Sequence, residues 1–156
     1  MRAKTRRLGL VSAALALCLA ATTLHAHHSF AMFDRTKEQV VVGQVERWAF
    51  NSPHVALYIK DAKGTVWGFE GAAPPSLIER IPKIDGYTFK YGDKLTIIYC
   101  PLRDGRSGGA IGLVVSADGA WYRPSDAGCG PNADNWKKWL EAGYTSREQA
   151  EAAAKK

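Results

Sequence analysis

The sequence predicts a mainly β protein: a small antiparallel barrel of the OB type with five to six strands, a short inserted helix and a C-terminal helical extension. Three observations predict it. Short segments rich in β-branched and aromatic residues recur between residues 39 and 122, with turn residues between them. One proline-rich interruption precedes a brief helical pattern, and helical periodicity returns after Cys129. An open β-sandwich is the alternative architecture.

The first 26 residues have the pattern of a secretory signal peptide. Four basic residues lie in the first seven positions, followed by the uncharged apolar run 8–24 and by Ala26, a small residue suited to cleavage. The alternative is a membrane-anchoring helix, for which the apolar run is short. We therefore expect residues 1–26 to be removed, a periplasmic or secreted chain without stable membrane insertion, a barrel domain over 27–123, and a linker with a helical tail over 124–156.

The formal net charge of +6 depends largely on that leader. Without residues 1–26, 17 basic and 15 acidic side chains remain, so the net charge falls to +2. The remaining basic residues are mixed with acidic ones and form no stripe that could neutralise a run of phosphates. A nucleic-acid partner is therefore not expected.

The strands follow from β-branched and aromatic residues bounded by turn chemistry. In the first one, strict alternation places Trp48 on the face opposite Arg47, and Gly43 marks a bend or bulge. Asn51-Ser52-Pro53 forms a turn, so His54 lies where the second strand begins. The predicted strands are 39–50, 55–61, 65–71, 94–102, 110–119 and 121–122.

Two helical regions are predicted outside the barrel strands. Ser76 is expected to cap a short helix that plugs or covers the barrel. In the tail, Trp136, Trp139 and Leu140 fall on one helical face, which suits packing over the core better than contact with a partner. Ser146 and Gln149 match a capping box before a second helix.

Two cysteines remain in the mature chain, Cys100 and Cys129. In an exported protein an even number of cysteines favours a disulfide, here one that ties the helical tail to the barrel. The chain-entropy treatment gives such a bond about 3 to 4 kcal/mol of stabilisation. The alternative is a pair of separate buried thiols.

Histidine placement suggests a metal site. Cleavage after Ala26 would make His27 the N-terminal residue, whose α-amine and imidazole can chelate a late first-row metal such as Cu(II). His54 can supply a third nitrogen, completing a histidine brace. His28 and Met32 are four residues apart and share a face of an extended segment, and a thioether beside imidazole suits copper. The alternative is a frayed terminus with an ordinary turn histidine.

A metal-free binding module is the competing function. Its barrel face would hold a small molecule or a protein partner through Trp48, Tyr58 and Trp67. Glu70 ends a strand and fits a ligand at the barrel mouth, a general base or a cap for loop amides. No nucleophile elbow, phosphate-binding loop or Cys-x-x-Cys motif is present, so enzymatic chemistry is not visible and a non-enzymatic role is favoured.

Six short motifs occur along the chain: His27-His28-Ser29-Phe30, Gly43-Gln44-Val45, Asn51-Ser52-Pro53-His54, Trp67-Gly68-Phe69-Glu70, Pro75-Ser76-Leu77 and Arg103-Asp104-Gly105. In this combination the chain resembles a family of small exported bacterial proteins known as a domain of unknown function. The resemblance covers about residues 26 to 119 and excludes the tail. It implies an exported, β-rich domain without an established activity, in which the HHSF start and the Pro-His pair are motif positions. Members usually have Asn-Pro-His without a spacer, whereas Ser52 stands between Asn51 and Pro53 here.

Overall fold

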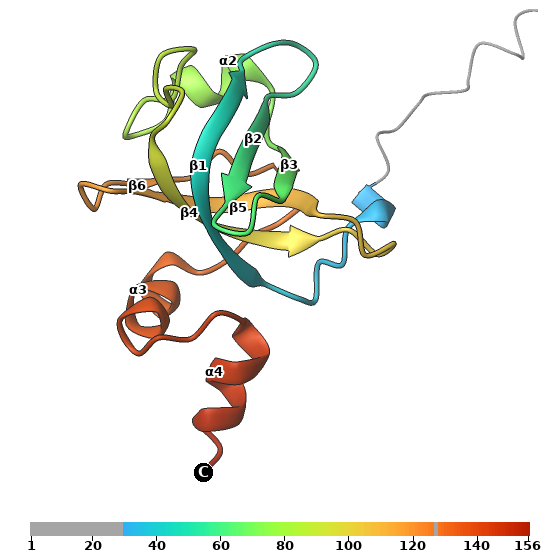
Figure 1. Ribbon diagram of the computed structural model, residues 1–156, viewed down its shortest axis with the longest axis vertical. Helices are drawn as coiled ribbons and strands as arrows, with labels where there is room; N and C mark the ends of the chain where they lie inside the picture. Colours follow the sequence, from blue (N-terminus) through green and yellow to red (C-terminus); the bar gives the residue numbers. More distant parts are fainter. Residues whose placement is uncertain (1–29, 127) are drawn as a thin grey trace, which may run out of the picture.

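A computed structural model describes residues 30–126 and 128–156 of the chain. The predicted signal peptide, His27 and His28 lie outside the described residues. Figure 1 shows a β-barrel with two helices below it and a short helix at the opposite end. The strands are β1 (Gln39–Ala49), β2 (Ala56–Asp61), β3 (Val66–Glu70), β4 (Lys94–Pro101), β5 (Gly108–Ser116) and β6 (Trp121–Tyr122). The helices are η2 (Phe30–Met32), α2 (Pro74–Ile78), α3 (Ala133–Glu141) and α4 (Arg147–Ala153).

Five strands close into a barrel of the OB type, as predicted. The sheet order is β3-β2-β1-β4-β5-β6, and β3 also pairs with β5. That closing pair is parallel, with Gly68 opposite Gly108, so the barrel is mixed while its other pairings are antiparallel. Gly108 has a φ of 150°, and a Cβ atom there would collide with the carbonyl oxygen of Gly68. Two glycines thus allow the backbones to meet at the closure.

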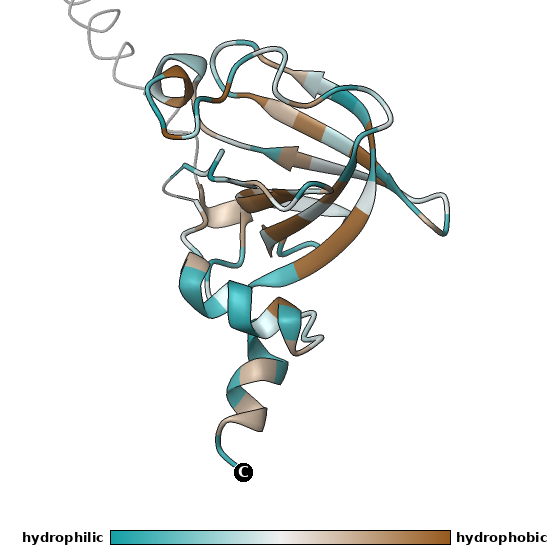
Figure 2. Cartoon of the chain, turned by 90° about the vertical axis from the view of Figure 1, so that its left-hand side faces the viewer, coloured by the Kyte–Doolittle hydropathy of each residue, from teal (hydrophilic) through white to brown (hydrophobic). Residues whose placement is uncertain are grey.

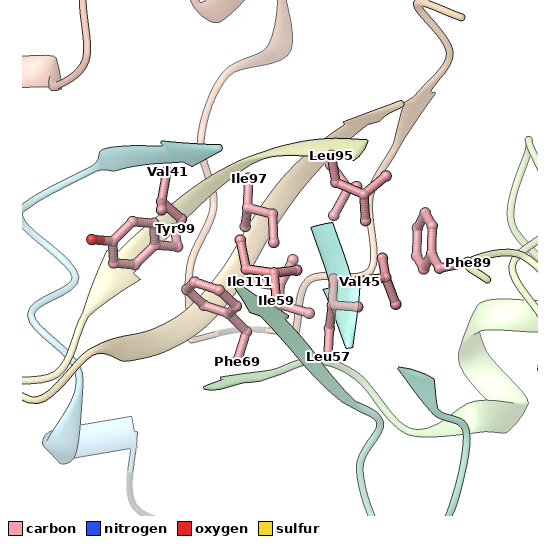
Figure 3. Close-up of a cluster of buried hydrophobic side chains, with 11 residues drawn as sticks. Val41, Val45, Leu57, Ile59, Phe69, Phe89, Leu95, Ile97, Tyr99 and Ile111 are labelled. Atoms are coloured by element: carbon pink, nitrogen blue, oxygen red, sulfur yellow. The ribbon is translucent and has the colours of Figure 1, made fainter. Parts of the chain in front are cut away.

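Side chains from all five strands fill the barrel. Figure 3 shows Tyr99 and Val41 at one end of this core and Phe89 at the other. Alternate residues of β2 and β4 point into the barrel. In β4 the outward-facing Ile98 is buried as well, because the tail packs over it. The buried members are Val41, Val45, Leu57, Ile59, Phe69, Phe89, Leu95, Ile97, Tyr99, Ile111 and Val114.

A bulge in β1 changes which face Trp48 occupies. The register shifts between Val45 and Arg47, so Arg47 lies opposite Tyr58 and Trp48 lies opposite Leu57. The extra residue turns Trp48 inward, where it packs against the core, whereas uninterrupted alternation predicted the outer face. Gly43 is not the bulge, but a Cβ there would approach the carbonyl oxygen of Lys60 at 2.6 Å.

The inserted helix α2 starts earlier than the sequence suggested. Its N-cap is Ala73, two prolines occupy its first positions, and Ser76 lies inside it. Proline suits the first turn because its missing N–H would have no helical partner there. Leu77 is the fully buried residue of α2, packing with Val55 and Ile84 under one end of the barrel.

The tail packs on the outer face of β4 and β5. Trp136 of α3 is fully buried against Ile98 and Leu113. Figure 2 shows that α3 and α4 are otherwise largely hydrophilic, which fits helices with one covered face. The Ser146 hydroxyl accepts a hydrogen bond from the Gln149 backbone N–H at 3.3 Å, as predicted for the α4 N-cap.

The start of β1 anchors the tail. Val40 donates its backbone N–H to the carbonyl of Thr145, and Arg147 donates to the carbonyl of Glu38, each at 2.9 Å. The Glu38 carboxylate, 8% exposed, accepts a hydrogen bond from the indole N–H of Trp136 at 2.5 Å. Within residues 30–126 and 128–156, no helix is both long and apolar enough to cross a membrane.

Candidate functional site

An open pocket of about 410 Å³ lies on the outer wall of the barrel beside β2 and β3. It brings together four residues that the sequence predicted as site residues, from three separate segments of the chain. Three of these side chains come from β2, β3 and the turn before β2, and the fourth from η2. These four residues are Met32, His54, Tyr58 and Glu70.

His54 contacts two carboxylates at this pocket. Its Nδ1 lies 2.9 Å from Oε1 of Glu70 and 3.9 Å from Oδ2 of Asp126. The His54 side chain is 17% exposed, whereas both carboxylates are more than a third exposed. Glu70 is paired with Ala56 of β2 and Ala110 of β5, so it is held by the barrel wall on both sides. The imidazole is therefore held between a strand and a loop.

The loop that carries Asp126 is held at both ends. The guanidinium of Arg80 donates to the carbonyl of Ser125 at 3.0 Å, and Ala72 donates its N–H to the carbonyl of Pro124 at 2.8 Å. On the other side, Cys129 forms the predicted disulfide with Cys100 of β4. The disulfide thus ties the start of the tail region to the barrel.

The described N-terminal segment runs directly beside the pocket. Asp34 donates its N–H to the carbonyl of Pro101 at 2.8 Å, and Arg103 donates to the carbonyl of Met32 at 2.9 Å. Phe30 packs against the cluster that contains the disulfide, and a Cβ at Gly128 would lie 2.8 Å from its ring. Phe30–Met32 forms a 3-10 turn, whereas the sequence predicted an extended segment through Met32. The Met32 side chain is 47% exposed at the pocket.

Trp48 and Trp67 do not join Tyr58 on a common face. Trp48 faces inward and its indole N–H donates to the carbonyl of Asp85 at 2.8 Å. Trp67 also packs against the core, near Tyr99, and its indole N–H donates to Asp61 at 2.9 Å. That hydrogen bond is the main reason why the pKa of Asp61 is lowered. The three aromatic residues of the predicted binding face are therefore separated, and only Tyr58 lines the pocket.

A larger cavity, of about 580 Å³, lies between α4 and residues 36–39. Its walls are mainly charged, and Arg147 pairs there with Glu38 and Glu151. None of its lining residues is a histidine, cysteine or methionine. This cavity therefore offers fewer groups for metal chemistry than the smaller pocket at His54.

Within the described part of the chain, no three His, Cys, Asp or Glu side chains are arranged to hold a metal ion. The predicted ligands His27 and His28 fall outside those residues, so the brace itself lies outside the described structure. Sequence reasoning missed Asp126. This residue carried no signal, because it approaches His54 only through the fold of the loop 123–132. Arg106, which also lines the pocket, belongs to a Gly-rich loop that is visible in the sequence.

Fold and site together define a small mixed β-barrel of the OB type whose outer wall holds a histidine beside two carboxylates. The model of the family of unknown function DUF6152 matches residues 14–111, and the chain belongs to that family. Among curated proteins and among solved structures, nothing matches the chain.

Proposed function

We propose that this protein is an exported metal-binding protein that handles copper through His54 and the histidines that precede the barrel. The single observation that carries the proposal is that Met32 and His54 line the same pocket. These residues come from different segments, yet they line one pocket. Imidazole and thioether groups together suit copper in both of its common oxidation states.

The chain between Phe30 and His27 is long enough for the N-terminal histidines to reach the pocket if it runs toward it. Phe30 packs against the cluster that includes Ala110, and Ala110 is the strand partner of Glu70. His27 precedes Phe30 by three residues, and an extended chain spans at most about 3.5 Å per residue, or about 10 Å in all. Its α-amine and imidazole would supply two nitrogens, and His54 would supply the third.

The ligand count supports a site that needs the N-terminus. His54 has carboxylate neighbours, but the described residues hold no group of three metal-binding side chains. A copper ion at this pocket would therefore take its remaining nitrogen ligands from His27 or His28. Export fits this proposal because cleavage after Ala26 would create the α-amine, and the disulfide is compatible with an oxidising compartment.

The test uses the exported, cleaved protein, whose start at His27 is first verified by intact mass. Titration with Cu(II), followed by native mass and electron paramagnetic resonance, is expected to give one ion per chain with nitrogen ligands. One alanine placed ahead of His27 keeps every side chain but moves the α-amine out of chelate position. This extension should weaken binding more than His54→Ala does, because His27 supplies two nitrogens and His54 one.

Equal binding by the extended and native proteins would overturn the brace. The pocket would then be a site for a small molecule, with Tyr58 and Glu70 as contacts. Met32→Leu provides a matched variant of similar size, since it removes the thioether alone. It should weaken Cu(I) binding and leave Cu(II) binding nearly unchanged, because the softer ion depends more on sulfur.

A further inference from the structure

A further pocket, of about 370 Å³, lies between the loop that follows β4 and residues 34–39. Every residue that lines it belongs to the described part of the chain. Its walls carry three cationic side chains and one carboxylate, so their formal charge is +2. The pocket shares Arg106 with the one at His54, but it contains neither His54 nor Met32. The four charged residues are Asp34, Lys37, Arg103 and Arg106.

Both arginines of this pocket are held in place through Nε. Nε of Arg103 donates to the carbonyl of Ala31 at 3.0 Å. Nε of Arg106 donates to Oδ2 of Asp104 at 2.8 Å. A guanidinium carries five N–H donors in a rigid plane, and each of these contacts uses one of them. The terminal nitrogens of the two arginines can therefore donate to an oxyanion while Nε fixes the side chain.

The carboxylate of Asp34 does not neutralise the pocket. Its Oδ1 accepts from the hydroxyl of Thr36 at 2.6 Å and from the Thr36 backbone N–H at 3.2 Å. Nζ of Lys37 lies 3.6 Å from this carboxylate and Nη1 of Arg103 lies 4.0 Å from it, both beyond ordinary hydrogen-bond distance. One carboxylate thus faces two cations across these longer distances, and positive charge remains in excess.

Two aromatic residues give the pocket an apolar surface. Trp67 is partly buried, and its ring meets the ring of Tyr99 edge to face, with 5.9 Å between the centroids. Figure 3 shows the Tyr99 hydroxyl pointing away from the buried core, and this hydroxyl donates to the side-chain oxygen of Gln39 at 3.0 Å. The pocket therefore combines cationic side chains with a flat apolar surface, a combination that suits an organic anion.

We infer that this pocket binds a small organic dianion, whose phosphate or paired carboxylate group contacts the three cationic side chains and whose apolar part lies on Trp67. An excess of two positive charges complements a dianion better than a single carboxylate or a neutral molecule. Arginine binds phosphate and carboxylate alike through paired N–H donors, so both groups share the required chemistry. The volume of about 370 Å³ lies near the lower end of the range for ligand pockets, which indicates a small ligand. None of the proposed copper ligands takes part.

The test uses the exported, cleaved protein without added metal, in a phosphate-free buffer near neutral pH and at low ionic strength. Phenyl phosphate and phthalate are the two dianionic probes, benzoate carries one charge, and phenol is neutral. The shift of the Trp67 indole N–H in nitrogen–proton NMR spectra, assigned with Trp67→Phe, gives the dissociation constant. At least one dianion should bind, benzoate should bind about fivefold more weakly, and phenol should not bind. Added salt should weaken binding, because it screens exposed charges.

Charge variants test which side chains hold the ligand. Because the side chains of Lys37 and Arg106 are 60% and 69% exposed, solvent weakens their contacts, and Lys37→Gln and Arg106→Gln should each weaken binding about two- to fivefold. Asp34→Asn should strengthen binding by a similar factor, because it removes the opposing charge and keeps an oxygen that can accept from Thr36. Lys138→Gln removes an exposed lysine of α3 that does not line the pocket, and it should leave the affinity unchanged. Urea unfolding of each variant shows whether the barrel remains folded.

The opposite signs of these effects separate ligand contacts from general damage. A damaged fold would weaken binding in every variant, whereas a gain in Asp34→Asn and a loss in Lys37→Gln support the inference. The absence of a Trp67 shift with both dianions at millimolar concentration would overturn it. Equal binding of benzoate, or an unchanged affinity in the Lys37→Gln, Arg106→Gln double variant, would overturn it as well.

Discussion

The indole N–H of Trp136 should make a measurable contribution to the docking of the tail on the barrel. Trp136 is fully buried, and its N–H donates to Glu38, a carboxylate that is only 8% exposed. The other carboxylate oxygen of Glu38 lies 3.6 Å from the guanidinium of Arg147. Trp136→Phe keeps an aromatic ring at this position and removes the donor.

The expected magnitude follows from these contacts. A hydrogen bond to a charged group contributes about 1.5 to 3 kcal/mol, and a buried acceptor that loses its donor pays the larger part of that range. The smaller ring adds about 1 kcal/mol through lost packing against Ile98 and Leu113. Trp136→Phe should therefore lower the free energy of unfolding by about 3 kcal/mol.

A double-mutant cycle isolates the hydrogen bond from the packing loss. In the Glu38→Ala background the acceptor is already gone, so Trp136→Phe should cost about 2 kcal/mol less than it does in the native protein. Urea unfolding of the four proteins gives the coupling energy. Trp139→Phe is the matched control: this tryptophan lies one turn along α3, is partly buried, and should lose about 1 kcal/mol or less. A coupling energy below about 0.5 kcal/mol between Glu38 and Trp136 would refute the reasoning.

Three further predictions concern the disulfide, the N-terminal segment and the barrel end. Replacing Cys100 and Cys129 by alanine should lower the free energy of unfolding by about 3 to 4 kcal/mol in chemical denaturation, because the bond closes a loop of 29 residues. Gly128→Val should push the Phe30 ring away and weaken Cu(II) binding in a calorimetric titration, while a variant that binds normally would contradict the proposed path of the N-terminus. Burial raises the pKa of Tyr99 to about 12. Since the unfolded chain releases this proton near pH 10, stability should fall between about pH 10 and 12 by about 2 to 3 kcal/mol, and Tyr99→Phe should remove that loss in unfolding experiments across this pH range.

Much of the barrel could be predicted because its strands carry their own local signals. The predicted strand 94–102 alternates polar and apolar side chains at its start and contains Pro101 near its end, and β4 covers Lys94–Pro101. The hairpin at Ala62-Lys63-Gly64 required a residue with positive φ, which Gly64 supplies at 83°. Such patterns depend on the pleat and on turn geometry, and both are local properties of the chain.

The faces of the aromatic residues could not be predicted in the same way. The Trp48 side chain faces the core because one extra residue in β1 reverses the inward and outward alternation of side chains. The residue type at Glu46 gives no sign of that insertion. Trp67 and Phe69 share a face of β3, so the burial of Phe69 carries Trp67 toward the core as well. A prediction of the binding face needs the pairing register, which is a tertiary property.

The candidate site was predictable in part for a related reason. His54 stood out because a proline turn and a strand start flank it. Its contact with Asp126 joins positions 72 residues apart and depends on the loop that Arg80 and the disulfide hold in place. No periodicity or short motif encodes a contact of that range.

The parallel closure between β3 and β5 also affects the order in which the barrel can form. A chain that emerges N-terminus first presents β1, β2 and β3 well before Gly108, so the outer edge of β3 stays open during that interval. An open strand edge is a template for pairing with other chains. The barrel can close only after β5, the last of its five strands, has been synthesised. The pocket wall at Glu70 is complete only once Glu70 pairs with Ala110 of β5. The synthesis of β5 therefore sets the earliest time at which this surface can exist.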